Sequence, residues 1–462
     1  MTIKIPILPS KQTFVKRPNV SHELDLKAIC VFVATGFFMG EDTYWKDQAC
    51  LAPAHTHKID DNGHLIKSEP WFQWYYAPRE LTFEQALEEY IQLFTNIIKE
   101  QVGDQQVILP LSGGLDSRSQ ALILKDLDNP VRAFSYAFQD GYPEHTIAKQ
   151  IAKYCNFSFD SFEIKKGYLW NCINDLADIN GCYSEFTHPR QMAVLNVLEN
   201  MKGLFSLGHW GDVLFDRGVP EGTQESAVLP LLFKKMVKPR GFELAQNVWE
   251  FWNLEGDFKS YLISRIEDDL AKIEIDNVSA KVRAYKTSQW AHRWTTTNLT
   301  VFEAANSITL PYYDDRMCQF ICTIPEAYLA DRRLQIAHIK QDKTLANITW
   351  QDQNPFNLNN YHYNITPYNL PYRVINKLKR EVRGIFGKPY IQRNWELQFV
   401  GGENAKYVEQ YLFSTDFNNW IPKALVKSTY NNFINGDAVA SSHAVSMLLT
   451  LSLWHQQNLL NF

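Results

Sequence analysis

Cysteine and excess positive charge are both scarce in this 462-residue sequence, and each absence argues against a class of protein. The seven cysteines are scattered and form no CxxC pair, which argues against a disulfide framework or a zinc site and favours a reducing compartment. Lysine and arginine total 46 against 51 for aspartate and glutamate, a net charge of −5. A chain with this balance offers no basic footprint for nucleic acid or for an anionic membrane.

Long hydrophobic runs are also missing. No uncharged apolar stretch is long enough for a membrane helix, and the first residues, Met-Thr-Ile-Lys-Ile-Pro, lack the apolar core of a signal peptide. Apolar residues make up 45% and charged residues 21% of the chain, a mixture typical of a globular protein with a substantial core. We therefore expect a cytoplasmic protein with room for two or more domains.

The most informative stretch is residues 107–118, Val-Ile-Leu-Pro-Leu-Ser-Gly-Gly-Leu-Asp-Ser-Arg. Its apolar start predicts a buried strand, and helix formers follow the two glycines, so the stretch predicts a strand, a sharp turn and a helix start. Backbone N–H groups left unpaired at such a turn bind anions, and Asp116 adds a carboxylate for a divalent metal. Together these groups suit a pyrophosphate carrying Mg²⁺, whereas the alternative is an ordinary glycine turn. The phosphate-binding residues expected are Ser112, Gly113, Gly114 and Ser117.

Strands and helices alternate around this turn. Residues 131–138 predict a second strand, and the spacing of strand, helix, strand and helix indicates an α/β fold with a parallel sheet. Ligands of such sheets lie at the carboxyl ends of the strands, which is where the glycine turn falls. Thr82, with Gln85 three residues later, predicts a capped helix start. The chain beyond residue 160 is expected to be mainly helical. The clearest predicted helices are residues 82–98, 144–154 and 438–453.

The segment Leu-Ser-Gly-Gly-Leu-Asp-Ser at residues 111–117 resembles the PP-loop of the ATP pyrophosphatases, in particular that of the asparagine synthetase group. The resemblance implies a parallel-sheet synthetase domain of the adenine nucleotide α-hydrolase type, with a helical C-terminal part. In that family a substrate carboxylate attacks the α-phosphate of ATP, and pyrophosphate leaves. An amine then displaces AMP from the acyl-adenylate and forms an amide. By this resemblance Leu111 and Ser135 would border the adenosine.

Residues 203–215, Gly-Leu-Phe-Ser-Leu-Gly-His-Trp-Gly-Asp-Val-Leu-Phe, resemble the family's second signature, a strand followed by a glycine-rich turn. Asp212 falls on the signature aspartate, so Asp116 and Asp212 would complete a Mg²⁺ site, with Gly208 in the nucleotide-binding turn. His209 replaces a family glutamate that orients or deprotonates the amine. Imidazole is a base near neutral pH, so His209 is a candidate acid–base group; the alternative is a residue that only packs or hydrogen-bonds.

A weaker resemblance follows in residues 308–340, where Pro-Tyr-Tyr-Asp replaces the family's Pro-Phe-Leu-Asp turn and Thr309 replaces an arginine. Gln353 falls where the family has a lysine that stabilises the departing pyrophosphate, and an uncharged amide cannot carry that charge. We expect Lys340, or else Lys343, to supply the missing cation from the preceding helix.

The N-terminal part is interpreted as a separate unit, residues 1–78, ahead of a synthetase domain at 79–462. It is expected to consist of strands and turns, with a buried strand at 28–34 and a hairpin turn, Asp-Asp-Asn-Gly, at 60–63. Its later part resembles the closing part of the glutaminase domain of asparagine synthetases. Glutaminase chemistry in that family needs a cysteine directly after the initiator methionine, where this chain has Thr2. We expect a small β layer without glutaminase activity.

The resemblance therefore predicts an ATP-dependent carbon–nitrogen ligase that forms AMP and pyrophosphate, with ATP and Mg²⁺ as cofactors. Its partners would be a small-molecule or peptide carboxylate and an amine, supplied as free ammonia, by the substrate itself or by another protein. Relatives without a glutaminase resemble lactam- and lasso-peptide-forming synthetases, or proteins linked to surface polysaccharides, and the short N-terminal layer favours the last. No nucleic-acid or membrane partner is expected, and a homodimer is left open.

Two other functions are weighed against this one. A degenerate homologue would bind nucleotide without making an amide and would act as a regulator or scaffold. The departures at His209 and Gln353 support that alternative, while the intact loop at 112–117 argues against it. A PP-loop enzyme that thiolates tRNA is disfavoured by the acidic balance and the unpaired cysteines.

Overall fold

The computed structural model describes residues 1–143, 145–349, 355–385 and 390–459. At its centre lies a five-stranded sheet in which every neighbouring pair of strands is parallel, which confirms the predicted α/β class. In spatial order the strands are β10 (Ile308–Thr309), β9 (Leu204–Ser206), β6 (Val107–Pro110), β7 (Val131–Phe138) and β8 (Ser158–Ile164). The second predicted strand therefore has the bounds that its sequence indicated.

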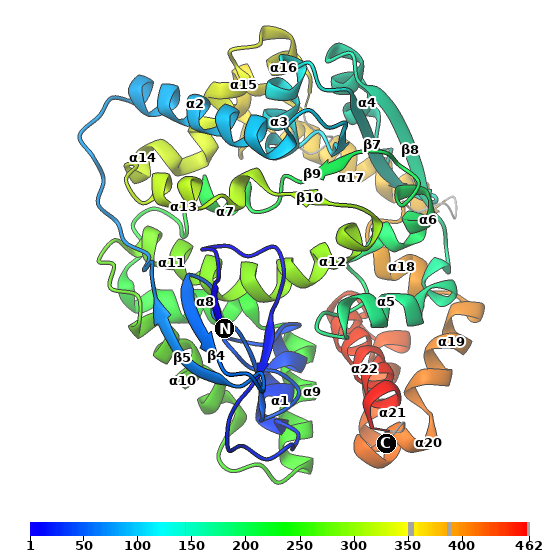
Figure 1. The fold of residues 1–462 in the computed structure, drawn as a ribbon. Coiled ribbons are helices and arrows are strands. Elements are labelled where there is room, and N and C mark those ends of the chain that lie inside the picture. The colour runs from blue at the N-terminus through cyan, green and yellow to red at the C-terminus, as the bar shows by residue number, and fades with distance from the viewer. Residues whose placement is uncertain (144, 350–354, 386–389, 460–462) are drawn as a thin grey trace.

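A group of helices lies beside this sheet, at the top of Figure 1. Helix α2 begins at the predicted cap: the backbone N–H of Gln85 donates to the Thr82 hydroxyl at 3.2 Å, and the Gln85 side chain accepts from the Thr82 N–H at 2.8 Å. Helix α3 follows β6 directly. The members of this group are α2 (Phe83–Val102), α3 (Leu115–Lys125), α4 (His145–Tyr154), α15 (Arg333–Ile339) and α16 (Lys343–Asn347).

Most of the remaining chain is helical, as expected. The C-terminal helix α22 (Ala438–Asn458) is buried over most of its length and packs against α9 and α21. None of the helices in the described part of the chain combines the length and apolarity needed to cross a membrane. The other helices are α5 (Ile173–Asn180), α6 (Leu195–Leu198), α7 (Gly211–Leu214), α8 (Val228–Met236), α9 (Pro239–Phe251), α10 (Phe258–Ala271), α11 (Val278–Tyr285), a π-helical segment (Lys286–Thr295), α12 (Thr296–Ala305), α13 (Asp315–Ile321), α14 (Glu326–Leu329), α17 (Leu370–Ile385), α18 (Asn394–Phe399), α19 (Gly402–Leu412), α20 (Thr415–Trp420) and α21 (Lys423–Asn435).

The N-terminal part forms two small antiparallel sheets, as expected for a β layer. The predicted hairpin turn at 60–63 joins β4 to β5, and the Asp60 carboxylate accepts from the N–H groups of Asn62 and His64. One sheet contains β1 (Thr2–Lys4), β4 (His55–Ile59) and β5 (Leu65–Pro70), and the other contains β2 (Phe14–Lys16) and β3 (Gln48–Cys50).

The strand predicted at 28–34 is wrong, because this segment is helix α1 (Leu26–Thr35). The Asp25 carboxylate caps its first turn, and Gly36, with φ +86°, ends it. Every residue from 28 to 35 is buried, so the apolar run shows neither the helical nor the strand period. Helix α1 packs against α9, beside which it lies in the lower half of Figure 1. Its buried residues belong to the same hydrophobic core as those of the central sheet. The proposed boundary at residue 78 stays a prediction.

Candidate functional site

The glycine loop between β6 and α3 has the geometry of an anion-binding turn. Gly113 has φ +80°, and a Cβ there would lie 2.6 Å from the Ile147 side chain, so only glycine fits without strain. Gly114 is the N-cap of α3 and provides no side-chain cap, which leaves the first N–H groups of α3 without a capping partner. The hydroxyls of Ser112 and Ser117 lie 3.4 Å apart beside them. Backbone and hydroxyl donors thus converge at a helix N-terminus, which suits phosphate.

This loop forms part of the wall of a cavity of about 1980 Å³. Eight of the residues predicted from the sequence line it: Leu111, Ser112, Gly114, Asp116, Ser117, Ser135, Gly208 and His209.

The other predicted residues do not line this cavity. Gly113 is buried in the turn, and Asp212 is exposed on the short helix α7. Lys340 is exposed just past the end of α15, so the structure does not bring it to the cavity. The position Gln353 lies outside the described residues.

Two glycines bring the second predicted stretch against the loop. A Cβ on Gly208 would lie 3.2 Å from the Asp116 Cβ, and a Cβ on Gly211 would lie only 2.2 Å from the Asp116 Oδ1. The absence of side chains at these two positions therefore allows the turn after β9 to pack directly on Asp116. Asp212, next in the chain after Gly211, is held near Asp116 by this contact, and its charge acts on that carboxyl.

Asp116 has two partners that sequence reasoning missed. Its carboxylate forms an ion pair with Arg332 and accepts from the Gln335 amide at 2.8 Å. Burial, together with the charge of Asp212, raises the pKa of Asp116 to about 6 despite these partners. Arg332 and the preceding Asp331 both have positive φ values, +60° and +56°, a strained pair held in place at the site. Nothing in the sequence signals a pairing across 216 positions.

The residues present fit a magnesium ion that is held partly by the protein and partly by the phosphates of a bound nucleotide. Asp116 and Asp212, whose charges act on each other, would supply carboxylate oxygens, the atoms that Mg²⁺ prefers, and two carboxylates suffice when phosphate oxygens and water provide the other ligands. Within residues 1–143, 145–349, 355–385 and 390–459, no three His, Cys, Asp or Glu residues cluster as metal ligands. These described residues therefore offer no closed site of the zinc type.

His209 lines the cavity with one ring nitrogen unsatisfied. Its Nδ1 is buried without a hydrogen-bond partner in the described part of the chain, and the ring stands edge-on to Phe302. Burial lowers the pKa of His209 to about 4, against a smaller opposing effect of Asp212. The imidazole is therefore neutral at pH 7, and a ligand group that reaches Nδ1 would satisfy it.

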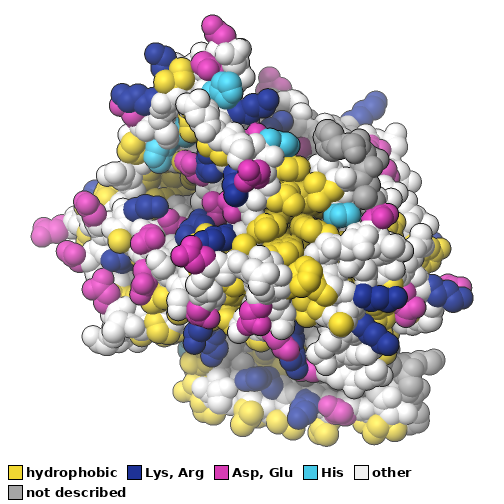
Figure 2. Space-filling view, turned by 90° about the horizontal axis from the view of Figure 1, so that it is seen from below, with side chains coloured by type: hydrophobic (Ala, Val, Ile, Leu, Met, Phe, Trp, Pro, Cys, Tyr) yellow, Lys and Arg dark blue, Asp and Glu magenta, His cyan; other side chains and the backbone are white. Residues whose placement is uncertain are grey.

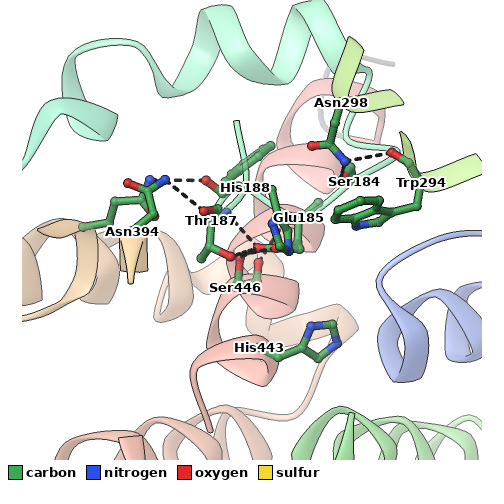
Figure 3. A network of polar contacts seen from close by, with 12 residues as sticks. Ser184, Glu185, Thr187, His188, Trp294, Asn298, Asn394, His443 and Ser446 are labelled. Atoms are coloured by element: carbon green, nitrogen blue, oxygen red, sulfur yellow. Dashed lines mark hydrogen bonds and ion pairs between the residues drawn. The ribbon is translucent and has the colours of Figure 1, made fainter. Parts of the chain in front are cut away.

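A buried carboxylate organises another part of the cavity wall (Figure 3). Glu185 accepts from the N–H and hydroxyl of Thr187 and from the Ser446 hydroxyl at 2.5 Å, and it pairs with His188 at 3.0 Å. Burial alone would raise the pKa of Glu185, but the charge of His188 and these hydrogen bonds outweigh it and hold the pKa well below its usual range. Asn394, at the start of α18, donates to the Thr187 carbonyl at 2.9 Å. The network ties α18 and α22 to the loop after α5.

Comparison with known proteins identifies the family to which the chain belongs. A family model described as asparagine synthase matches residues 89–345, a span that includes both glycine turns and Arg332. No curated protein matches the chain.

Solved structures also match part of the chain, among them two synthetases. The NMN synthetase from Francisella tularensis is 12% identical, with 44% of this chain and 92% of that chain covered and a TM-score of 0.23. The glutamine-dependent NAD⁺ synthetase from Acinetobacter baumannii, solved in complex with ADP, is 17% identical, with 39% of each chain covered and a TM-score of 0.19. At these TM-scores the structural likeness carries no argument, and the assignment rests on the family match.

Proposed function

Because the chain belongs to the asparagine synthase family, we propose that it is an ATP-dependent amide ligase that joins a carboxylate to an amine and releases AMP and pyrophosphate. At the level of the family, membership supports a nucleotide-binding, ATP-dependent amide ligase. One observation carries the finer proposal: the glycine loop, with its uncapped helix N-terminus, lies on the wall of the large cavity.

The loop residues would hold the pyrophosphate part of ATP. The hydroxyls of Ser112 and Ser117 and the first N–H groups of α3 are the donors, and Leu111 and Ser135 would border the adenosine. The carboxylates of Asp116 and Asp212 would hold Mg²⁺, which would supply positive charge to offset the charge of the phosphates.

In the proposed reaction the substrate carboxylate attacks the α-phosphate, and the bond to pyrophosphate breaks. The amine then attacks the acyl carbon, AMP leaves, and one proton is lost from nitrogen. His209, neutral at pH 7 with Nδ1 unsatisfied, is proposed to accept that proton. Arg332 pairs with the loop residue Asp116, whereas Lys340 is exposed just past the end of α15. We therefore assign the cation beside the departing pyrophosphate to Arg332.

The nitrogen of the amide is proposed not to come from glutamine hydrolysed by a cysteine of this chain. Six of the seven cysteines are buried and the seventh, Cys172, is partly buried. Burial raises the pKa of the Cys172 thiol to about 12 and that of the Cys322 thiol to about 11. Thiols that stay protonated are poor nucleophiles, which supports a ligase without glutaminase activity.

The size of the cavity supports an acid substrate that binds beside the nucleotide. About 1980 Å³ is roughly twice the upper end of the usual range for small-molecule pockets. The Glu185 network, on a different part of the wall from the loop, would then border the second substrate.

ATP–pyrophosphate exchange tests the proposal. The purified chain is incubated with ATP, Mg²⁺, labelled pyrophosphate and a panel of amino acids, uronic acids and peptides. We expect exchange with at least one acid, lost in Asp116→Ala and retained in Asp104→Ala, which removes an exposed carboxylate elsewhere. ATP binding in calorimetry without exchange for any acid would contradict the ligase and favour a nucleotide-binding regulator or scaffold.

Neighbouring arginines test the assigned cation. Arg332 pairs with Asp116, while Arg333 is exposed and lies over the Phe83 ring. Because a charge-assisted contact contributes about 1.5–3 kcal/mol, Arg332→Ala should slow exchange about 10- to 100-fold. Arg333→Ala should leave the rate within about twofold. Equal rates for the two variants would remove Arg332 from the reaction.

A further inference from the structure

Helix α17 (Leu370–Ile385) exposes an apolar stripe that no other element of the described chain covers. Its apolar side chains recur at helical spacing, so they share one face. Each is between 47% and 81% exposed, whereas α22 buries almost all of its apolar residues. The stripe consists of Leu370, Val374, Ile375, Leu378, Val382 and Ile385. A contiguous exposed patch of this kind marks an interaction surface.

The stripe continues ahead of the helix. Ile365 and Tyr368, just before α17, are also more than half exposed. Figure 2, seen from below, shows hydrophobic side chains in a row along the lower edge of the molecule, with Lys and Arg side chains beside them. That edge is the far side of Figure 1, where α17 lies.

The charge on α17 opposes the charge of the chain. Five basic residues and one acid give the helix a net charge of +4, in a protein whose total is −5. At helical spacing, Arg373 and Lys377 fall on one flank of the stripe. Lys379 and Arg383 fall on the other flank, where they also line the mouth of the cavity. Basic residues on both flanks of an apolar face are the pattern of a helix that lies in the interface of an anionic membrane.

We propose that α17 docks on the surface of an anionic lipid bilayer, with its apolar stripe at the boundary between the headgroups and the acyl chains and its flanking lysines and arginines on the lipid phosphates. The expectation of no membrane partner depended on the total charge and on the absence of a spanning segment. Neither feature argues against docking by α17. The helix carries a net positive charge although the whole chain is negative, and a helix that lies on a membrane need not be long enough to cross it.

Docking would also orient the cavity. Ile375, Leu378 and Val382 line the cavity and at the same time are about half exposed, so α17 forms part of its rim. If the stripe lay on a bilayer, the opening of the cavity would face the lipid headgroups. An acid substrate carried by a lipid could then reach the site without leaving the membrane surface.

Co-sedimentation of the full chain with vesicles tests the proposal. The chain should pellet with vesicles of phosphatidylcholine mixed with phosphatidylglycerol at low salt, and should not pellet with phosphatidylcholine alone. The double variant Leu378→Glu/Val382→Glu should lower the partition coefficient about tenfold or more, because two charges replace apolar contacts. Lys377→Glu/Lys379→Glu should weaken binding to the mixed vesicles and reduce its dependence on salt.

A matched control removes exposed apolar residues elsewhere. Ile66 on β5 and Ile434 on α21 are as exposed as the residues of the stripe, so Ile66→Glu/Ile434→Glu should pellet like the unaltered chain. Melting curves for all variants should coincide, because every altered side chain is exposed. Absence of pelleting with the mixed vesicles, or equal loss in the control, overturns the proposal. So does a dimer in sedimentation velocity that only the α17 variants dissociate, since the stripe would then join two copies of the chain.

Discussion

Gly113 and Gly114 are neighbours in the phosphate loop, yet they place different demands on the backbone. Gly113 adopts φ +80° with the Ile147 side chain close behind it, whereas Gly114 has φ −68°, which any residue accepts. Gly113→Ala should therefore lower the free energy of unfolding by about 1–3 kcal/mol, through left-handed backbone strain and the clash with Ile147. Urea denaturation would show it as a lower midpoint with an unchanged slope.

Gly114→Ala is the matched control. Its new methyl group would meet only the Ser112 hydroxyl, at 3.3 Å. We expect the free energy of unfolding to change by less than about 0.5 kcal/mol. Equal losses in the two variants would show that the left-handed conformation of Gly113 is not what the loop requires.

At the scale of elements, the sequence is most informative where its local signals agree. The strand β7 (Val131–Phe138) and the start of α2 were predicted because an apolar run and a capping box are both readable within a few residues. Helix α1 was not, because burial on all sides removes the period that separates a helix from a strand. The remaining signals for α1 were Asp25 ahead of it and Gly36 behind it.

The capping box of α2 gives a prediction for this scale. Thr82→Ala removes the hydroxyl that accepts from the Gln85 N–H and should lower the free energy of unfolding by about 1 kcal/mol. Thr82→Ser keeps the hydroxyl acceptor, so its free energy of unfolding should stay within about 0.3 kcal/mol of that of the unaltered chain. Thermal or urea unfolding measures both. The cap contributes nothing if the alanine and serine variants unfold alike.

Across the whole molecule, the site is assembled from segments whose proximity the sequence does not encode locally. The loop at residues 112–117 was predicted because one short motif holds both its turn and its donors. The ion pair of Asp116 with Arg332 and the hydrogen bond of Ser446 to Glu185 join positions 216 and 261 apart. Such contacts follow from how the helices pack on the sheet, which propensity and spacing cannot supply.

Packing of this kind also buries histidines throughout the molecule. Burial lowers the pKa of His338 and of His443 to about 4, and burial together with the charge of Arg293 lowers that of His292 to about 3. All three stay neutral in the folded chain at pH values where the unfolded chain binds a proton. Their contribution to stability is therefore complete above the unfolded value of about 6.5 and is lost as the pH falls toward 4. Asp116, whose pKa burial raises to about 6, acts in the opposite direction between about pH 4 and 6 and offsets part of this loss, whereas His209, whose pKa burial also lowers to about 4, adds to it.

Acidification should consequently destabilise the fold well before most carboxylates are protonated. Between about pH 7 and pH 5 each of the three histidines should remove up to about 2 kcal/mol from the free energy of unfolding, measured as a falling urea midpoint. His338→Gln should make this dependence shallower, whatever it does to stability at pH 7, because the slope counts only the protons that the unfolded state gains. A midpoint that stays flat or rises as the pH falls over this range would contradict the prediction. Parallel slopes for His338→Gln and the unaltered chain would show that His338 is protonated equally in both states, as an imidazole in contact with water would be.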